Sequence, residues 1–292
     1  MKDIIVIVGP TGVGKTKLSI ELAKKLDAEI INGDSVAIYK KLDIGSAKPT
    51  KKEQENIPHH LIDIRDVDEY YSVFEYQKDV RKLIEEISSR NKRIIIVGGT
   101  GLYLKAALYD YEFTEGTTYK NYENLTNEEI LKKLKEYTKE ELPHINNRKR
   151  LIRLLNKYEN NETITNNKDH ILYNIKVIGL TTERETLYER INSRVDNMFN
   201  NGLIEEVEAL KEQYKTSRVL NSGIGYKEFY DYLYNGVSIE KVKEQIKLNS
   251  RRYAKRQYTF FRNQFETKWF DVNLNNFQIT IEEVYNYIEK EA

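Results

Sequence analysis

The segment that most constrains the fold lies at the start of the chain, where a strand-like run over residues 3–8 leads directly into the octapeptide GPTGVGKT of residues 9–16. The octapeptide fits the pattern G-x-x-x-x-G-K-[ST] at every fixed position. Apolar residues at helical spacing follow over residues 18–26, so a strand, a glycine-rich loop and a helix are predicted in this order. That order is typical of a phosphate-binding loop, or P-loop, in a parallel α/β sheet.

The chemistry of this loop predicts a diphosphate site. Its glycines let the backbone turn tightly and direct amide N–H groups inward, while the helix that follows adds its positive end. Lys15 supplies a compact cation, and the hydroxyl of Thr16 is predicted to bind Mg²⁺. Nucleotide-binding and ATP-binding proteins share the pattern, so it does not identify what carries the diphosphate. The predicted diphosphate-binding residues are Gly9, Pro10, Thr11, Gly12, Val13, Gly14, Lys15 and Thr16.

Composition indicates an ordinary folded protein without disulfides. The chain has 292 residues, which suggests two domains or one domain with a large insertion. It has no cysteine, which excludes disulfides, thiolate zinc sites and a cysteine nucleophile. No apolar run approaches the roughly 20 residues of a membrane helix, and a cleaved signal peptide would have to remove the P-loop itself. We therefore expect a cytoplasmic protein with no membrane partner.

Strand-like segments recur along the chain over residues 28–32, 60–64, 93–97 and 174–180, separated by helical or loop stretches. This rhythm predicts the α/β class, with a P-loop-type parallel sheet covered by helices. Residues 114–169 are rich in Lys, Glu, Asn and Thr with leucines at helical spacing, which predicts a helical insertion domain. The core is then formed by residues 1–113 and 170–292. The second part is mostly helical, with helices expected over residues 183–199, 203–214, 226–234 and 238–265.

Two loops at strand ends carry candidate site residues, because ligands of such sheets lie beyond the carboxyl ends of the strands. Asp34 and Ser35 follow the second strand and put an acid beside the P-loop, although either residue is also a good helix cap. Residues 97–101, Val-Gly-Gly-Thr-Gly, follow the fourth strand, where a Walker-type NTPase normally has an acid for magnesium. These glycines favour either close approach of a ligand or a tight strand-to-helix connection.

Arg190 and Arg194 lie four residues apart and so project from the same face of a predicted helix. Near a diphosphate, guanidinium groups suit leaving-group oxygens that gain charge, while a surface ion-pairing role is the alternative. The adjacent His59 and His60 alternate across a strand and cannot chelate one ion together, which indicates a structural role.

Basic residues are clustered although the net charge is only +1. Residues 247–263 contain six Lys or Arg and no acid, with Tyr and Phe interleaved, and a second acid-free basic stretch spans residues 148–157. Such runs are often solvated helix faces. Two of them, one with aromatic rings that can stack on bases, favour contact with nucleic acid.

Taken together, these motifs resemble those of the tRNA dimethylallyltransferase family over essentially the entire chain. The resemblance rests on the P-loop and on GDSVAIYKKLDIGSAKP (33–49), PHHLID (58–63), VGGTGLY (97–103), RLIR (150–153), RINSR (190–194), GIGYKE (223–228) and AKRQYTFFR (254–262). The chain departs from many family members at four positions, where Gln, Thr, Asp and Trp are replaced by Ala37, Ser46, Asn147 and Phe260.

The resemblance implies transfer of a dimethylallyl group from dimethylallyl diphosphate to the N6 amine of the adenosine 3′ to the anticodon in tRNA, with release of diphosphate. It implies that Asp34 is the general base, that Thr16 and Arg194 are also catalytic, and that Arg190 helps to bind the diphosphate. Mg²⁺ is the implied cofactor, the tRNA anticodon stem-loop is the implied partner, and a monomer is expected. The residues implied to face tRNA are Asp34, Ser35, Val36, Ala37, Thr100, Lys149, Arg150, Arg153, Gly223, Gly225, Tyr226, Lys227, Lys255, Arg256, Gln257 and Arg262.

Two other functions fit parts of the pattern. A small-molecule or nucleoside kinase of the P-loop superfamily would use Asp34 to activate a hydroxyl and Arg190 and Arg194 as lid residues. A non-catalytic RNA-binding switch would use the P-loop only to sense a nucleotide. The basic aromatic helix disfavours the kinase, and the position of Asp34 disfavours the switch.

Overall fold

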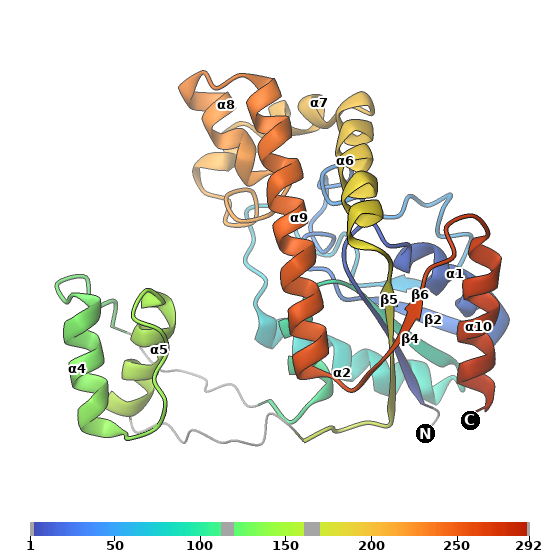
Figure 1. Ribbon diagram of the computed structural model, residues 1–292, viewed down its shortest axis with the longest axis horizontal. Coiled ribbons are helices and arrows are strands. Elements are labelled where there is room, and N and C mark those ends of the chain that lie inside the picture. The colour runs from blue at the N-terminus through green and yellow to red at the C-terminus, as the bar shows by residue number, and fades with distance from the viewer. Residues whose placement is uncertain (1–2, 112–119, 161–169, 291–292) are drawn as a thin grey trace. The chain divides into compact units, whose positions relative to one another are not determined.

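The computed structural model describes residues 3–111, 120–160 and 170–290. The chain divides into two compact units, one of residues 1–109 and 171–292 and one of residues 110–170. The first is an α/β domain and the second contains a pair of helices (Figure 1). The second unit extends slightly beyond the predicted insertion of residues 114–169 on both sides.

A six-stranded parallel sheet with the order β3-β2-β4-β1-β5-β6 forms the centre of the first unit. β1 lies between β4 and β5, so its five residues are all buried, which explains a continuous apolar run rather than an alternating one. The α/β prediction is confirmed. The strands are β1 Ile4–Val8, β2 Ala28–Asn32, β3 His59–His60, β4 Arg93–Val97, β5 Ile175–Thr181 and β6 Thr267–Asp271.

Helices cover both faces of this sheet. Alternate residues of β1 pack into two separate apolar cores because successive side chains of a strand point to opposite faces. One core includes residues of α2 (Val73–Ser89) and α3 (Gly101–Leu108), and the other includes residues of α1 (Lys15–Leu26) and α10 (Phe277–Lys290). The P-loop thus connects a strand and a helix that are each anchored in the same core.

The helices of the second half bring the basic segment to the sheet. α9 (Ile239–Gln264) packs against α6 (Arg184–Asn200) and against α3, which follows β4 (Figure 1). α7 (Leu203–Glu208) and α8 (Tyr230–Asn235) are short. Within the described ranges, no helix is long and apolar enough to cross a membrane.

Three predicted elements are wrong in extent. The helix expected over residues 226–234 begins at Tyr230 as α8, after a 3-10 helix over Lys227–Phe229. The strand expected over residues 60–64 ends at His60, because Leu61 and Asp63 adopt positive φ angles of 61° and 58° that no strand accommodates. The helix expected over residues 203–214 stops at Glu208, and a separate 3-10 helix spans Glu212–Lys215. Its Tyr214 is buried with the hydroxyl donating to the carbonyl of Tyr226 at 2.9 Å, so tertiary packing overrides the helical pattern there.

The second unit is stabilised by a small core between α4 (Asn127–Tyr137) and α5 (Arg148–Glu159). The Arg148 guanidinium donates to the carbonyls of Leu125 and Tyr122 at 2.8 and 2.7 Å, so this cation has a structural task. The other basic residues of the predicted tRNA-facing stretch, Lys149, Arg150 and Arg153, are exposed on α5.

Candidate active site

The P-loop requires glycine at its turns. Gly9 and Gly14 have φ angles of 138° and 111°, a region that other residues rarely adopt. A Cβ on Gly9 would lie 2.6 Å from the carbonyl oxygen of Leu180, and one on Gly14 would lie 2.8 Å from the ring of Phe277. β5 and α10 therefore pack directly against the loop, and any larger residue would displace them.

Lys15 folds back over the loop that precedes it. Its ammonium donates to the carbonyl oxygens of Gly9 and Pro10 at 3.0 and 2.8 Å. Burial, followed by the charge of Arg194, lowers the pKa of Lys15 to about 7, while the charge of Asp34 acts in the opposite direction. An anion that binds beside Lys15 would stabilise its protonated form, because the opposite charge replaces the interactions with water that burial removes.

Arg194 and Arg190 on α6 both reach the P-loop. Arg194 donates to the hydroxyl of Thr11 and to the carbonyl of Ser46, the latter at 3.3 Å, and burial lowers its pKa while Asp34 opposes the shift. Arg190 donates to the carbonyl of Gly12 at 3.0 Å. The helical spacing thus brings two guanidinium groups to the same loop as Lys15.

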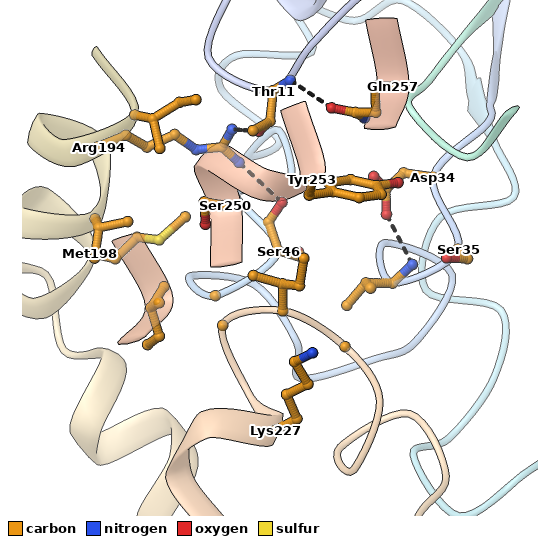
Figure 2. Close-up of a pocket in the computed structure, with 18 of the residues that line it drawn as sticks. Thr11, Asp34, Ser35, Ser46, Arg194, Met198, Lys227, Ser250, Tyr253 and Gln257 are labelled. Carbon is orange, nitrogen blue, oxygen red and sulfur yellow. Dashed lines mark hydrogen bonds between the residues drawn. The ribbon is translucent and has the colours of Figure 1, made fainter. Parts of the chain in front are cut away.

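Two cavities meet at this cationic cluster. The smaller has a volume of about 270 Å³ and is lined by Asp34, Tyr253 and an apolar wall (Figure 2). The larger, of about 1270 Å³, extends along Thr16 and Arg190. Because Lys15, Arg194 and Met198 line both, the cations lie at the junction of the two spaces. The apolar wall of the smaller cavity consists of Ile191, Val195, Met198 and Ile246.

Asp34 holds the turn after β2, where the described residues form no helix before β3, and it also lines the smaller cavity. One carboxylate oxygen, Oδ1, accepts from the backbone N–H groups of Val36 and Ala37 at 2.8 and 3.4 Å, which holds the turn after β2. The side chain of Asn32 also helps to hold Asp34, because Oδ1 of Asn32 accepts from the Asp34 N–H at 3.0 Å. In the part of the chain that the structure describes, Oδ2 of Asp34 has no hydrogen-bond donor. That oxygen is available to a ligand in the smaller cavity.

The glycine-rich turn after β4 is explained by packing of protein against protein. A Cβ on Gly98 would lie 2.1 Å from the backbone of Gly33, and one on Gly99 would lie 2.1 Å from the amide nitrogen of Gln257. A Cβ on Gly101 would meet the ring of Phe260 at 2.2 Å. The sequence left open a ligand approach or a tight strand-to-helix connection, and these contacts support the tight connection, against which α9 packs.

The residues implied to face tRNA occupy different environments. Lining the smaller cavity are Asp34, Ser35, Val36, Gly223, Gly225, Lys227, Arg256 and Gln257. Ala37, Tyr226 and Gln257 have buried side chains. Thr100 lies next to the cavity, where its hydroxyl accepts from the Ser35 N–H at 3.1 Å. Lys255 and Arg262 are exposed on α9, with the Arg262 guanidinium 5.5 Å from the ring centre of Tyr258.

Sequence reasoning missed Glu206, which organises the loop beside Arg194. Its carboxylate accepts from the backbone N–H groups of Asp43, Ile44 and Gly45 at 3.0, 2.8 and 3.1 Å and from the Tyr226 hydroxyl at 2.7 Å. An acid on a short amphipathic helix has no local signature that distinguishes it from a surface residue. Tyr253, whose pKa is raised by burial and then by Asp34, belonged to the basic aromatic stretch, where its ring could have been noticed.

The two histidines are accounted for by structural contacts, as predicted. Nε2 of His60 lies 2.7 Å from Oε2 of Glu29, and Nδ1 of His59 lies 2.8 Å from the carbonyl oxygen of Ile57. Over residues 3–111, 120–160 and 170–290, no group of three or more His, Cys, Asp or Glu side chains is arranged to hold a metal ion.

Comparison with known proteins identifies the family. Residues 37–264 match the IPP transferase family. The chain is 46% identical to a tRNA dimethylallyltransferase of Anoxybacillus flavithermus, over 99% of this chain and 96% of that protein. Its structure is similar to a tRNA delta(2)-isopentenylpyrophosphate transferase of Staphylococcus epidermidis, with a TM-score of 0.77, 38% identity and full coverage of both chains. It is also similar to a eukaryotic dimethylallyltransferase acting on tRNA, with a TM-score of 0.82 and 28% identity over 99% of this chain and 80% of that one. The P-loop, the two arginines of α6 and the acid after β2 thus occur in a chain that belongs to the tRNA dimethylallyltransferase (IPP transferase) family.

Proposed function

We propose that this protein transfers a dimethylallyl group from dimethylallyl diphosphate to the N6 amine of the adenosine 3′ to the anticodon in tRNA. The observation that carries the proposal is the smaller cavity, whose lining combines the cations Lys15 and Arg194 with the acid Asp34 and with apolar side chains of α6. Dimethylallyl diphosphate likewise consists of a polyanionic diphosphate and a short apolar chain.

The diphosphate binds at the junction of the two cavities in this proposal. The P-loop amides and the amino terminus of α1 supply donors and a positive field, and Lys15 supplies a cation whose pKa of about 7 rises when the anion arrives. Arg194 and Arg190 add guanidinium donors. Charge develops on the leaving diphosphate as its bond to carbon breaks, so these groups stabilise the transition state more than the bound donor.

Asp34 acts as the base. An adenine amine is barely acidic, so its N–H bond is not ionised beforehand. The nitrogen lone pair forms the new N–C bond, the allylic C–O bond breaks with its electrons leaving on the diphosphate, and the N6 proton passes to the carboxylate. Oδ1 of Asp34 is held by two backbone N–H groups, which leaves Oδ2 free on a residue that lines the cavity. The measured range for such proton transfer is about 10²- to 10⁴-fold in rate.

The apolar side chains of Ile191, Val195 and Met198 suit the five-carbon chain. They lie on the face of α6 that also carries Arg194, so the position of the charged group fixes where the carbon chain can run. Exclusion of water from this wall strengthens the electrostatic contacts and prevents hydrolysis of the activated allyl group.

Magnesium fits this site only as an ion that binds mainly to diphosphate and water. Thr16 is exposed on the larger cavity and its hydroxyl makes no hydrogen bond within the described residues, so it is free to serve as a ligand. Mg²⁺ keeps several waters and uses few protein ligands, which agrees with the lack of an acid after β4. When bound, it would neutralise charge on the leaving group.

The tRNA would contact the exposed cations near the cavity opening and on α5. Lys227 and Arg256 line the smaller cavity, Lys255 is exposed on α9, and Lys149, Arg150 and Arg153 are exposed on the second unit. The acceptor adenine must leave its stack to reach Asp34, at a cost of about a few kcal/mol that is smallest in a single-stranded loop.

One assay tests the proposal. The protein is incubated with unmodified tRNA, labelled dimethylallyl diphosphate and Mg²⁺, and in parallel with ATP and candidate acceptors without RNA. We expect label in the tRNA at the adenosine 3′ to the anticodon and no net ATP consumption. ATP turnover without RNA, together with no label in tRNA, would identify the protein as a kinase.

A further inference from the structure

A third pocket adjoins the smaller active-site cavity on the side of the turn after Asp34. It has a volume of about 320 Å³, and we define the tyrosine pocket by Tyr39, Tyr70, Tyr71, Tyr103 and Arg218. Ser35, Val36, Ser222 and Gly223 line both this pocket and the active-site cavity. The two spaces therefore share a wall formed by the turn after Asp34 and by the loop of residues 222–223.

The rim of the pocket carries an unusual side chain. Tyr70 is 57% exposed, which makes it the most exposed of the large apolar residues in the described part of the chain. The Arg218 guanidinium lies 4.9 Å from the centre of its ring. An aromatic ring and a guanidinium plane in contact are the two surfaces on which nucleobases stack in single-stranded RNA complexes.

The guanidinium of Arg218 remains open to a ligand. Its guanidinium has no hydrogen bond or ion pair among them, whereas Arg65, which lies over the ring of Tyr71, donates to the carbonyl of Ile64 at 3.0 Å. Five N–H donors thus remain available at the mouth of the pocket. They suit a phosphate oxygen or the edge of a base.

The inner wall of the tyrosine pocket is formed by tyrosines that hydrogen bonds and ring packing hold in place. Tyr71 is buried, and its hydroxyl donates to Asp79 at 2.8 Å. The Tyr103 hydroxyl donates to the carbonyl of Tyr71 at 3.3 Å, and its ring packs 4.5 Å from that of Tyr76. A fixed aromatic floor beneath an exposed aromatic rim favours a planar guest, and the volume lies at the small end of the range for ligand pockets.

We propose that the tyrosine pocket holds the base of a nucleotide that neighbours the acceptor adenosine in the RNA chain. This inference rests on the proposed function, because a flipped acceptor leaves its neighbour without a stacking partner. The shared wall keeps the two spaces adjacent, so one base enters the active-site cavity while the next along the chain stacks on Tyr70 and Arg218. The pocket then helps to hold the acceptor out of its stack.

Binding measurements on an anticodon stem-loop RNA test the site. Replacement Tyr70→Ala should raise the Kd for this RNA about tenfold, the effect expected for loss of a base stacked on an aromatic ring, and should leave the affinity for a diphosphate unchanged. Tyr70→Phe, which keeps the ring, should bind RNA like the parent. Tyr230→Ala is the matched control, because Tyr230 is 43% exposed on α8 and does not line the pocket.

Abasic substitutions in the RNA identify the guest. In the parent, an abasic nucleotide at one position next to the acceptor should weaken binding about tenfold, and in Tyr70→Ala the same substitution should cost nothing more. If the losses from the abasic substitution and from Tyr70→Ala add at every neighbouring position while prenyl transfer is intact, the proposed base pocket is wrong and the proposed reaction stands. If the two changes are not additive in RNA binding but no prenyl group is transferred, the proposed reaction is wrong and the proposed base pocket is supported.

Discussion

The side-chain oxygen of Gln257 accepts a hydrogen bond from the backbone N–H of Thr11 at 2.9 Å, and its amide nitrogen donates to the carbonyl of Gly99 at 3.1 Å. One buried residue of α9 therefore connects the P-loop after β1 with the turn after β4. The same helix also carries the exposed Lys255 and Arg256. The helix proposed to contact RNA is tied directly to the loop proposed to bind the diphosphate.

Replacement Gln257→Ala should destabilise the protein, because the Thr11 N–H loses its acceptor and the Gly99 carbonyl keeps only the Tyr253 hydroxyl as a donor, at 3.0 Å. We expect the free energy of unfolding to fall by about 1–3 kcal/mol and the KM for dimethylallyl diphosphate to rise. Urea titration gives the first quantity and steady-state kinetics the second. Asn263→Ala on the exposed face of α9 should change neither, and equal stability of the two variants would contradict the role of Gln257.

The Asp34 carboxylate should be needed for the chemical step. Asp34→Asn keeps an oxygen for the N–H groups of Val36 and Ala37 but cannot take the proton, so kcat should fall by about 10²- to 10⁴-fold with RNA affinity retained. Asp34→Ala should in addition lose about 1 kcal/mol of stability, because the turn loses its acceptor. Single-turnover rates compare the variants, and an Asn variant as fast as the parent would exclude Asp34 as the base.

Diphosphate binding should weaken above neutral pH. The pKa of Lys15 is about 7 in the free protein and rises when an anion binds, so the protonated form is the one that binds. Between the free and bound pKa values the Kd should increase by up to about tenfold per pH unit. Titration calorimetry at several pH values measures this slope.

The diphosphate itself titrates in the same range, so Lys15→Met provides the reference. This variant should bind more weakly at neutral pH and should lack the upward slope of Kd. A parent whose Kd is flat with pH after this correction would place the lysine outside the anion site.

Glu206 should position the loop that holds Arg194. Its carboxylate accepts from three consecutive backbone N–H groups and from Tyr226, and the same loop presents the Ser46 carbonyl to Arg194. Glu206→Gln should cost about 2–4 kcal/mol of stability, because an amide offers only one acceptor oxygen. Thermal denaturation and diphosphate affinity provide the measurements. Glu205→Gln is the control one residue away on an exposed position, and similar losses in both would show that Glu206 has no special part.

Lys255 and Arg256 should contribute to RNA affinity through phosphate contacts. Each replacement by Ala should weaken tRNA binding and reduce the slope of log K against log salt concentration by about 0.7–0.9. Lys268→Ala on the exposed edge strand β6 serves as the control. Unchanged salt slopes in both α9 variants would move the RNA surface away from this helix.

Much of the architecture follows from local pattern. The P-loop, β1 and α1 are specified within residues 3–26, because glycines with positive φ, a buried apolar strand and helical spacing each act over a few residues. The capping box that begins α2 is equally local, with the Ser72 hydroxyl accepting from the Glu75 N–H at 3.1 Å. The four-residue spacing of Arg190 and Arg194 likewise brings both to the P-loop.

The sequence by itself determined the anion loop, the α/β class and the family, since those are properties of short motifs and of their order. Tertiary structure decided how the pieces serve one site: that Glu206 holds residues 43–45, that Gln257 joins α9 to Thr11, and that Ile191, Val195 and Met198 face a cavity. The sequence around an acid, an amide or an apolar side chain on a helix does not indicate which residue it will contact. Its role depends on which distant segment folding brings against it.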